Sequence, residues 1–199
     1  MSSKLTHTFY ERDDVVQISR ELLGKVLCTK INGFFTSGMI VETEAYNGRK
    51  DRACHAYPDV RTKRTNTLYE SPGIAYIYLC YGIHHLFNVV TNREGFADAV
   101  LVRAVKPLVG TEHMLQRRQK ENLKPVIANG PGKLSQALGI TTSLNETDLK
   151  GDTIWIEDSG KEIPTDQIKE SKRIGVDYAG EDAELLWRFT IRNSEWVSR

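Results

Sequence analysis

The sequence predicts an α+β fold with a mostly antiparallel sheet, and two observations predict it. Apolar runs of strand length follow one another along the chain with turn signals between them, and amphipathic helical segments are interspersed among these runs. The chain has 199 residues, of which 40% are hydrophobic and 27% are charged. This length and composition are typical of one globular domain with a single large core, so we expect residues 1–199 to form one domain.

The elements can be assigned in chain order. A helix is expected from Asp13 or Asp14, which can cap its start, as far as Gly24, which can end it. Two strands are expected over residues 25–30 and 34–46, joined at Asn32-Gly33, a strong hairpin signal. After a polar, irregular stretch over 47–65, strands are predicted at 74–80, 83–91, 99–105, 153–156 and 187–192, and helices at 111–120 and 130–138.

The hairpin formed by residues 74–80 and 83–91 has an unusual tip. Hairpin turns favour Asn, Asp or Gly, because the turn needs positive φ and faces solvent. Here the two tip residues are Tyr81 and Gly82. A large ring at a hairpin apex has little of its own protein to pack against, so Tyr81 is a candidate to insert into a stack of nucleic-acid bases.

Tyrosines are concentrated in the same region. Six of the eight lie between positions 46 and 81. Such residues ordinarily belong to the core, and that alternative stays open here. However, Tyr76 and Tyr78 share one face of a strand because strand side chains alternate with a period of two. The concentration therefore also fits a stacking pocket beside the Tyr81 tip.

Two carboxylates stand at positions 42 and 44 of a predicted strand, where period two places them on one face. Glutamate is depleted in strands, so the pair needs an explanation. One explanation is an edge strand with one wet face. The other is a general base, because a glutamate ionised at neutral pH can accept a proton from water.

The net charge and the positions of the basic residues bear on whether the protein binds nucleic acid. The net charge is only +1, which weakly opposes a purely electrostatic nucleic-acid binder. Basic residues nevertheless cluster, either as solvated faces or as a phosphate track. The clusters are Arg49, Lys50 and Arg52; Arg61, Lys63 and Arg64; Arg117, Arg118 and Lys120; and Lys172 with Arg173. The segment Asn129–Leu134 is either a simple turn or a helix start that binds a single phosphate with help from Lys133.

Several classes of protein and site are not indicated. The sequence lacks the run of about 18 apolar residues that spans a membrane, and its N-terminus lacks a signal core, so we expect no membrane association and an intracellular protein. Cys28, Cys54 and Cys80 are odd in number and form no Cys-x-x-Cys pair, which indicates neither a disulfide framework nor a zinc site. His84 and His85 point to opposite faces of a strand and cannot share a metal, while a lone loop residue such as His55 is more often structural than catalytic. We expect no metal and no cofactor.

These pieces together resemble the alkyladenine (3-methyladenine) DNA glycosylase family of the mammalian-type fold. The matching segments run in order over roughly residues 8–198. They are IVETEAY at 40–46, ACHAY at 53–57, PGIAYIYLCYGIHHLFN at 72–88, VLVRAVKP at 100–107, NGPGKLSQAL at 129–138, RIGV at 173–176, RF at 188–189 and WVS at 196–198. The resemblance implies a curved sheet with flanking helices and a protruding aromatic hairpin.

The resemblance also implies roles for residues. A damaged purine is flipped from duplex DNA, and its N-glycosidic bond is hydrolysed. Glu44 would activate the attacking water, held also by Arg103 and a backbone carbonyl near Ile174. The base pocket would be lined by Tyr46, His55 and Tyr78, with Asn88 placed to refuse the guanine amine. Tyr81, with Gly82 and Ile83 beside it, would enter the minor groove, while Arg61, Arg64 and Lys133 would contact DNA.

Further expectations concern mechanism and alternatives. The matching segments around Glu44 and Ile174 carry no lysine, so we expect a monofunctional enzyme without a lyase step, acting as a monomer on double-stranded DNA that contains damaged purines. The loop 61–66 departs from the family's Thr-Pro-Arg-Asn spacing, which puts the phosphate contacts of Arg61 and Arg64 in question. Two alternatives remain open: a non-catalytic nucleic-acid-binding module of similar fold, and a glycoside hydrolase using Glu42 and Glu44.

Overall fold

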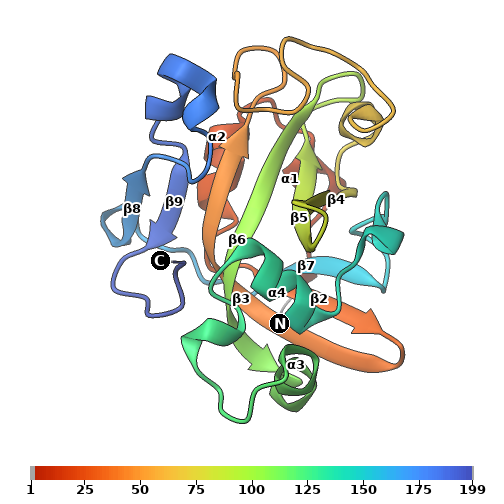
Figure 1. Ribbon diagram of the computed structural model, residues 1–199, viewed down its shortest axis with the longest axis vertical. Coiled ribbons are helices and arrows are strands. Elements are labelled where there is room, and N and C mark those ends of the chain that lie inside the picture. The colour runs from red at the N-terminus through yellow and green to blue at the C-terminus, as the bar shows by residue number, and fades with distance from the viewer. Residues whose placement is uncertain (1–2, 199) are drawn as a thin grey trace.

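The computed structural model describes residues 3–198, and nine of its strands form one sheet in which every pair is antiparallel (Figure 1). The strand order is β1-β7-β2-β3-β6-β5-β4, with β9 paired to β3 and β8 paired to β9. The strands are β1 (Ser3–Lys4), β2 (Val26–Ile31), β3 (Phe34–Tyr46), β4 (Ala75–Cys80), β5 (His84–Thr91), β6 (Asp98–Val109), β7 (Ile154–Asp158), β8 (Ile168–Ser171) and β9 (Arg188–Ile191).

Short helices flank this sheet. The α-helices are α1 (His7–Tyr10), α2 (Val15–Glu21), α3 (Thr111–Arg118) and α4 (Pro131–Leu138). The 3₁₀ segments are η1 (Asn66–Tyr69), η2 (Pro125–Ile127), η3 (Thr142–Leu144), η4 (Thr165–Gln167) and η5 (Asp177–Glu184). No helix in the described range 3–198 has both the length and the apolar character required to cross a bilayer.

The long strand β3 is the reason the sheet curls. Its residues 34–39 pair with β2, whereas Glu42–Glu44 pair with β9 along the same edge, and β6 follows the other edge for most of its length. A β-bulge interrupts the β3–β6 ladder around Glu42, and such bulges increase the local twist. Figure 1 shows β3 and β6 crossing the centre of the molecule, with β8 and β9 on one side and β4 and β5 on the other.

The two faces of the curled sheet have different environments. One face carries the main apolar core, to which α2 contributes Val15 and Ile18 and α4 contributes Leu134. The other face carries a smaller cluster that includes Leu68 and Tyr69 from the stretch 47–69 and Tyr76 from β4. The expected α+β class and curved antiparallel sheet are therefore confirmed, and the second face remains free to form a site.

Most predicted elements are present with small differences at their ends. Asp14 caps α2, because its side chain accepts a hydrogen bond from the Gln17 N–H at 2.9 Å. Strand β6 continues to Val109, four residues beyond the expected end, because its extension pairs with Ser37 and Gly38. Helix α3 ends at Arg118, two residues early. The sequence analysis missed α1, β1 and β8, which have four, two and four residues and are too short to show periodicity.

The aromatic hairpin differs from expectation at one residue. Tyr81 and Gly82 both have positive φ, at 52° and 72°, and the Ile83 N–H donates to the Cys80 carbonyl at 3.2 Å. This is the two-residue turn that was expected. However, strand β5 begins at His84, so the assignment of Ile83 to a strand was wrong. Ile83 belongs to the exposed tip together with Tyr81 and Gly82.

Glu42 joins the sheet to the end of the chain. Its carboxylate is fully buried and accepts hydrogen bonds from Arg103 Nε at 2.8 Å, Arg188 Nε at 2.7 Å, and the Ser198 N–H and hydroxyl at 2.6 and 2.7 Å. Burial by itself raises the pKa of Glu42, but Arg103, Ser198 and Arg188 together outweigh it and leave the pKa below its ordinary value. Ionised Glu42 therefore holds β3, β6, β9 and the C-terminal segment together.

Because its pKa is lower in the folded state, Glu42 contributes stability that is fully present above the unfolded-state pKa of about 4.3 and is lost as pH falls through the folded value. Glu42→Gln should lower the free energy of unfolding at pH 7 by on the order of 3 kcal/mol, because it leaves a buried arginine less well paired. Urea unfolding at pH 7, 5, 4 and 3 measures both effects. The variant should lose less stability than wild type between pH 5 and 3, and parallel curves would contradict this role.

Candidate active site

A row of residues crosses four strands of the free face. Glu44 on β3 pairs with Leu101 on β6, Leu101 pairs with Asn88 on β5, and Asn88 pairs with Tyr76 on β4. Directly paired residues in antiparallel strands point to the same side of the sheet. The register therefore lines up a carboxylate, an apolar side chain, an amide and a phenol although they lie far apart in the sequence.

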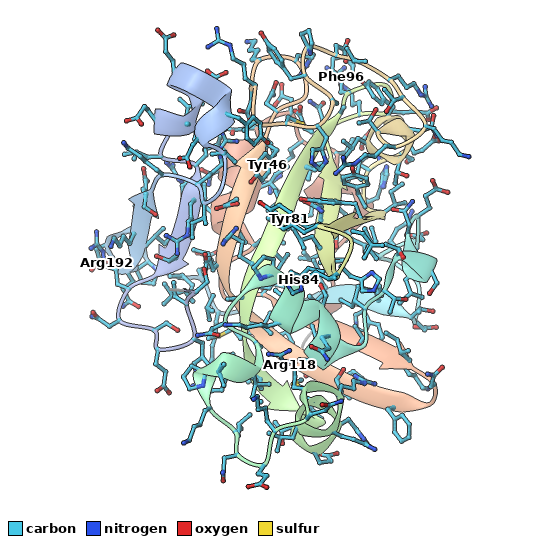
Figure 2. The ribbon with its side chains drawn as sticks, in the orientation of Figure 1. Tyr46, Tyr81, His84, Phe96, Arg118 and Arg192 are labelled. Carbon is cyan, nitrogen blue, oxygen red and sulfur yellow. The ribbon has the colours of Figure 1, made fainter. Side chains whose placement is uncertain are left out.

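A cavity of about 370 Å³ opens above this row. The sheet forms its floor, the segment 53–68 forms one wall, and residues 174–178 form another, while the hairpin tip stands at its mouth. Figure 2 labels Tyr46 and Tyr81, which both line the cavity. Of the predicted site residues, the structure brings together Tyr46, His55, Arg64, Tyr78, Tyr81, Asn88, Arg103 and Ile174 around this cavity.

Glu44 lies behind the cavity wall and is fully buried. Its Oε1 accepts a hydrogen bond from the Ile174 backbone N–H at 2.8 Å, and its Oε2 accepts from the Tyr46 hydroxyl at 2.8 Å and from Arg103 Nη1 at 3.1 Å. All three donors belong to residues that line the cavity. Glu44 is therefore hydrogen-bonded to the lining of the cavity on three sides. The Ile174 group that reaches Glu44 is the amide N–H, and the water contact expected of a backbone carbonyl near Ile174 stays a prediction.

The partners of Glu44 are held in fixed protonation states. Burial, and then the neighbouring carboxylate, raise the pKa of the Tyr46 phenol well above its ordinary value, so the hydroxyl remains a donor. Burial of Arg103 opposes its charge, but Glu44 and Glu42 outweigh that cost and raise the pKa of the guanidinium. The Glu44 carboxylate is therefore surrounded by donors across the physiological pH range.

A buried ion pair that the sequence analysis missed fixes the Ile174 wall. The Arg173 guanidinium makes a two-pronged contact with Asp51, donates to the Ala45 carbonyl at 2.9 Å, and lies 4.8 Å from the centre of the Tyr46 ring. Both charged side chains are completely buried. This pair attaches the loop after β3 to the segment before Ile174. The two residues are 122 positions apart, so sequence spacing gave no signal for their contact.

Three aromatic rings form the far side of the cavity. His55 lies edge-on to Tyr78, with ring centres 4.6 Å apart, and its Nδ1 is 3.1 Å from the Tyr76 hydroxyl. His55 is partly open to solvent at the rim, but packing against these rings, together with the Arg64 charge, lowers its pKa. Burial raises the pKa of Tyr76 to about 12. The wall therefore consists of neutral rings at neutral pH.

Asn88 occupies the floor with its amide already oriented. Its Nδ2 donates to the carbonyls of Tyr76 at 3.0 Å and Leu86 at 3.3 Å. Because both donors are engaged, the side chain offers a ligand only an acceptor oxygen. An acceptor does not repel the amine of guanine by hydrogen-bond chemistry. Any refusal of guanine at Asn88 would therefore be steric.

The remaining predicted DNA-binding residues lie in three different settings. Tyr81 is 91% exposed and Ile83 is 71% exposed at the hairpin tip, with Gly82 between them. Arg61 is engaged by its own loop, since it donates to Asn66 and pairs with Glu70 at 2.9 Å. Lys133, in the first turn of α4, donates to Asn129 at 3.0 Å. The phosphate contacts expected of Arg61 and Lys133 stay predictions.

Arg64 is exposed and lies at the cavity, and the DNA contact expected of it stays a prediction. It lines the cavity, where its Nη2 is 3.3 Å from His55 Nε2 and its guanidinium is 5.3 Å from the centre of the Tyr78 ring. The sequence placed it in a basic cluster, but the fold turns it toward the aromatic wall. Sequence reasoning also missed Tyr178, which lines the cavity and donates to the Ala53 carbonyl at 3.1 Å.

The two carboxylates of β3, Glu42 and Glu44, differ in whether their partners line the cavity. Arg103 contacts both, which confirms that they share one face. The other partners of Glu42 are Arg188 and Ser198, and neither lines the cavity. Glu42 is thus used within the protein, and the geometry does not favour a glycoside-hydrolase mechanism that needs both carboxylates at the substrate.

Comparison with known proteins identifies the family of this chain. The family model described as methylpurine-DNA glycosylase matches residues 8–195. A protein of Clostridium tetani named "Putative 3-methyladenine DNA glycosylase" is 44% identical over 204 residues, covering 98% of this chain and 99% of its own. A protein of Chlamydia felis with the same name is 48% identical over 188 residues, covering 94% and 95%.

A family model spanning nearly the whole chain and relatives of this identity settle the membership, and the cavity beside Glu44 lies within the matched region. The chain therefore belongs to the methylpurine-DNA glycosylase family and is a DNA glycosylase, a hydrolase of N-glycosyl bonds that acts in DNA repair by base excision.

Proposed function

We propose that this enzyme flips alkylated or deaminated purines out of duplex DNA and hydrolyses the N-glycosidic bond with a water that Glu44 activates. One observation carries the proposal: Glu44 is held by three donors that all line the same aromatic cavity. A carboxylate has about four lone-pair sites, so one remains for a water. We expect the enzyme to act as a monomer.

The cavity suits a flipped base. Extruding a nucleotide costs a few kcal/mol and costs least for a lesion that pairs poorly. Stacking on aromatic side chains returns about 1–3 kcal/mol per base. Tyr46, His55 and Tyr78 supply such surfaces around a volume typical of small-molecule sites. The free energy gained by stacking comes closest to offsetting the free energy of flipping when the base is damaged and pairs poorly. The pocket therefore favours lesions over normal purines.

The chemical step balances with one carboxylate. Water oxygen attacks the sugar carbon, Glu44 takes its proton, and the bond to the base nitrogen breaks with its electron pair leaving on the base. A cationic methylpurine leaves as a neutral molecule, whereas a neutral purine needs a proton on departure. The residues that line the cavity include no lysine, which supports a monofunctional reaction without a lyase step. Since Glu44 is covered here, Tyr46 or the Ile174 segment must shift when DNA binds.

The hairpin tip supplies the wedge. Tyr81 projects almost fully into solvent at the mouth of the cavity. On DNA, its ring would enter the minor groove and fill the place that the extruded nucleotide leaves. The tip and the pocket would then act on the same nucleotide from two sides, which slows its return to the stack.

Glu44→Gln should reduce base release by about 10²- to 10⁴-fold while lesion binding is retained, because the amide keeps the shape but cannot take a proton. Single-turnover release from duplex DNA carrying an alkylated purine measures the rate, and a gel-shift titration measures binding. The matched control is Glu42→Gln, which changes the other buried carboxylate of β3. Its release rate is divided by the fraction of the variant that is folded. Near-normal release by Glu44→Gln, or an equal loss in both variants, would refute the assignment.

Tyr81→Ala should slow release of a well-paired lesion by roughly 10- to 100-fold, because one stacking contact is lost from the flipped state. The defect should shrink for a mispaired lesion, whose flipping costs less. Tyr81→Trp should retain most activity, since its ring can still stack.

The control for this wedge is Phe34→Ala, which removes an exposed aromatic beside the tip of the β2–β3 hairpin, outside the cavity. It should leave release of both lesions near the wild-type rate. If Tyr81→Ala also cleaves the paired lesion at the wild-type rate, Tyr81 is an ordinary surface residue.

A further inference from the structure

The buried ion pair of Asp51 and Arg173 lies behind the cavity and does not belong to its lining. Arg173 directly precedes Ile174, whose backbone N–H donates to Glu44 at 2.8 Å. The Arg173 guanidinium also lies 4.8 Å from the centre of the Tyr46 ring, and the Tyr46 hydroxyl donates to Glu44 at 2.8 Å. Two of the three donors to Glu44 are therefore next to this one guanidinium.

Arg173 attaches the Ile174 wall to the strand that carries Glu44. Its Nη1 donates to the Ala45 carbonyl at 2.9 Å and to Asp51, and its Nη2 donates to Asp51 at 2.8 Å and to the Asp182 carbonyl at 3.0 Å. Ala45 directly follows Glu44 on β3. Because a guanidinium is planar and holds its N–H donors in a fixed fork, these bonds set both the spacing and the orientation of the segments.

Asp51 fixes the second wall of the cavity to the same point. Its side chain accepts a hydrogen bond from the Ala53 N–H at 3.0 Å, and its backbone carbonyl accepts one from the Cys54 N–H at 2.9 Å. Ala53, Cys54 and the following His55 all line the cavity. The Asp51 carboxylate therefore joins the wall that carries His55 to the guanidinium of Arg173.

We propose that Asp51 and Arg173 are a positioning pair that sets the rate of base release by holding the Ile174 N–H and the Tyr46 hydroxyl at Glu44. This inference rests on the proposed function of Glu44. Neither side chain of the pair lines the cavity, so the pair acts through the donors that it holds. A displacement of about 1 Å in such a site lowers a rate by up to about 10²-fold.

The charges of the pair are part of the argument. Removing two charges from water is costly, and apolar residues of similar volume often pack at least as stably. Apolar packing cannot, however, hold two backbone carbonyls in a set direction, as Arg173 holds those of Ala45 and Asp182. The pair therefore gives this wall a fixed geometry, which the chemical step at Glu44 uses.

Asp51→Asn tests the pair because it keeps the shape of the side chain and removes its charge. Single-turnover base release from duplex DNA with an alkylated purine, at saturating enzyme and per folded molecule, should slow by about 10- to 100-fold. Lesion binding in a gel-shift titration should stay within about threefold of wild type. In a Glu44→Gln background, the same substitution should leave the remaining rate unchanged, because coupled sites are not additive. An equal slowing in both backgrounds overturns the inference.

A second variant separates the rate from stability. Asp51→Asn combined with Arg173→Gln leaves no buried charge unpaired, so it should fold even where Asp51→Asn alone does not. Because the glutamine lacks the guanidinium fork, its rate of base release should remain about 10- to 100-fold below wild type. If the rate returns to that of wild type as stability returns, the pair serves stability alone and the inference is wrong.

Asp98→Asn is the matched control. Asp98 is a fully buried carboxylate that holds the same loop through the Gly48 N–H at 3.1 Å and Asn47 at 3.2 Å, and it does not line the cavity. Its rate per folded molecule should stay within about threefold of wild type. If Asp98→Asn slows release as much as Asp51→Asn does, general order of the loop controls the rate and the inference is wrong.

The two proposals fail in different ways. If Glu44→Gln releases the base at a near-normal rate, the proposed function itself is overturned. If Glu44→Gln is inactive but folded Asp51→Asn releases the base at the wild-type rate, only the positioning role of the pair is overturned.

Discussion

Arg103 donates to Glu42 and to Glu44, and these three buried charged side chains fix the relation between the sheet and the cavity. Removing charges from water is costly, and such a cluster persists only when every charge is paired and hydrogen-bonded. That condition is met because Arg188 adds a second positive charge to Glu42. Two carboxylates and two guanidiniums thus balance within the protein.

The two glutamates have different hydrogen-bond donors. Glu42 has four donors and joins β9 and the C-terminal segment to β3. Glu44 has three, all from the cavity wall, and retains one lone-pair site. A β-bulge beside Glu42 shifts the register of the β3–β6 ladder, because Glu42 pairs with Ala104 whereas Thr43 pairs with Val102. Arg103 lies at this shift and contacts both glutamates. One strand thereby supplies a structural carboxylate and, two residues away, the carboxylate that we propose activates the water.

The elements that follow from local chemistry could be predicted. Period two placed Glu42 and Glu44 on one face, and the tip chemistry of Tyr81-Gly82 indicated an exposed ring. Contacts between distant segments could not, because residues such as Asp51 and Arg173 give no sign of their pairing in spacing or composition. Arg64 shows the same limit: its basic cluster was visible, but only the fold shows that it faces Tyr78.

The account's central claim is that the cavity beside Glu44 receives the extruded purine. A crystal structure of Glu44→Gln bound to duplex DNA with one alkylated purine tests it most directly. We expect the lesion stacked among Tyr46, His55 and Tyr78, its sugar carbon facing position 44, and the Tyr81 ring in the vacated place. A lesion still stacked in the duplex, or bound away from this cavity, would contradict the claim.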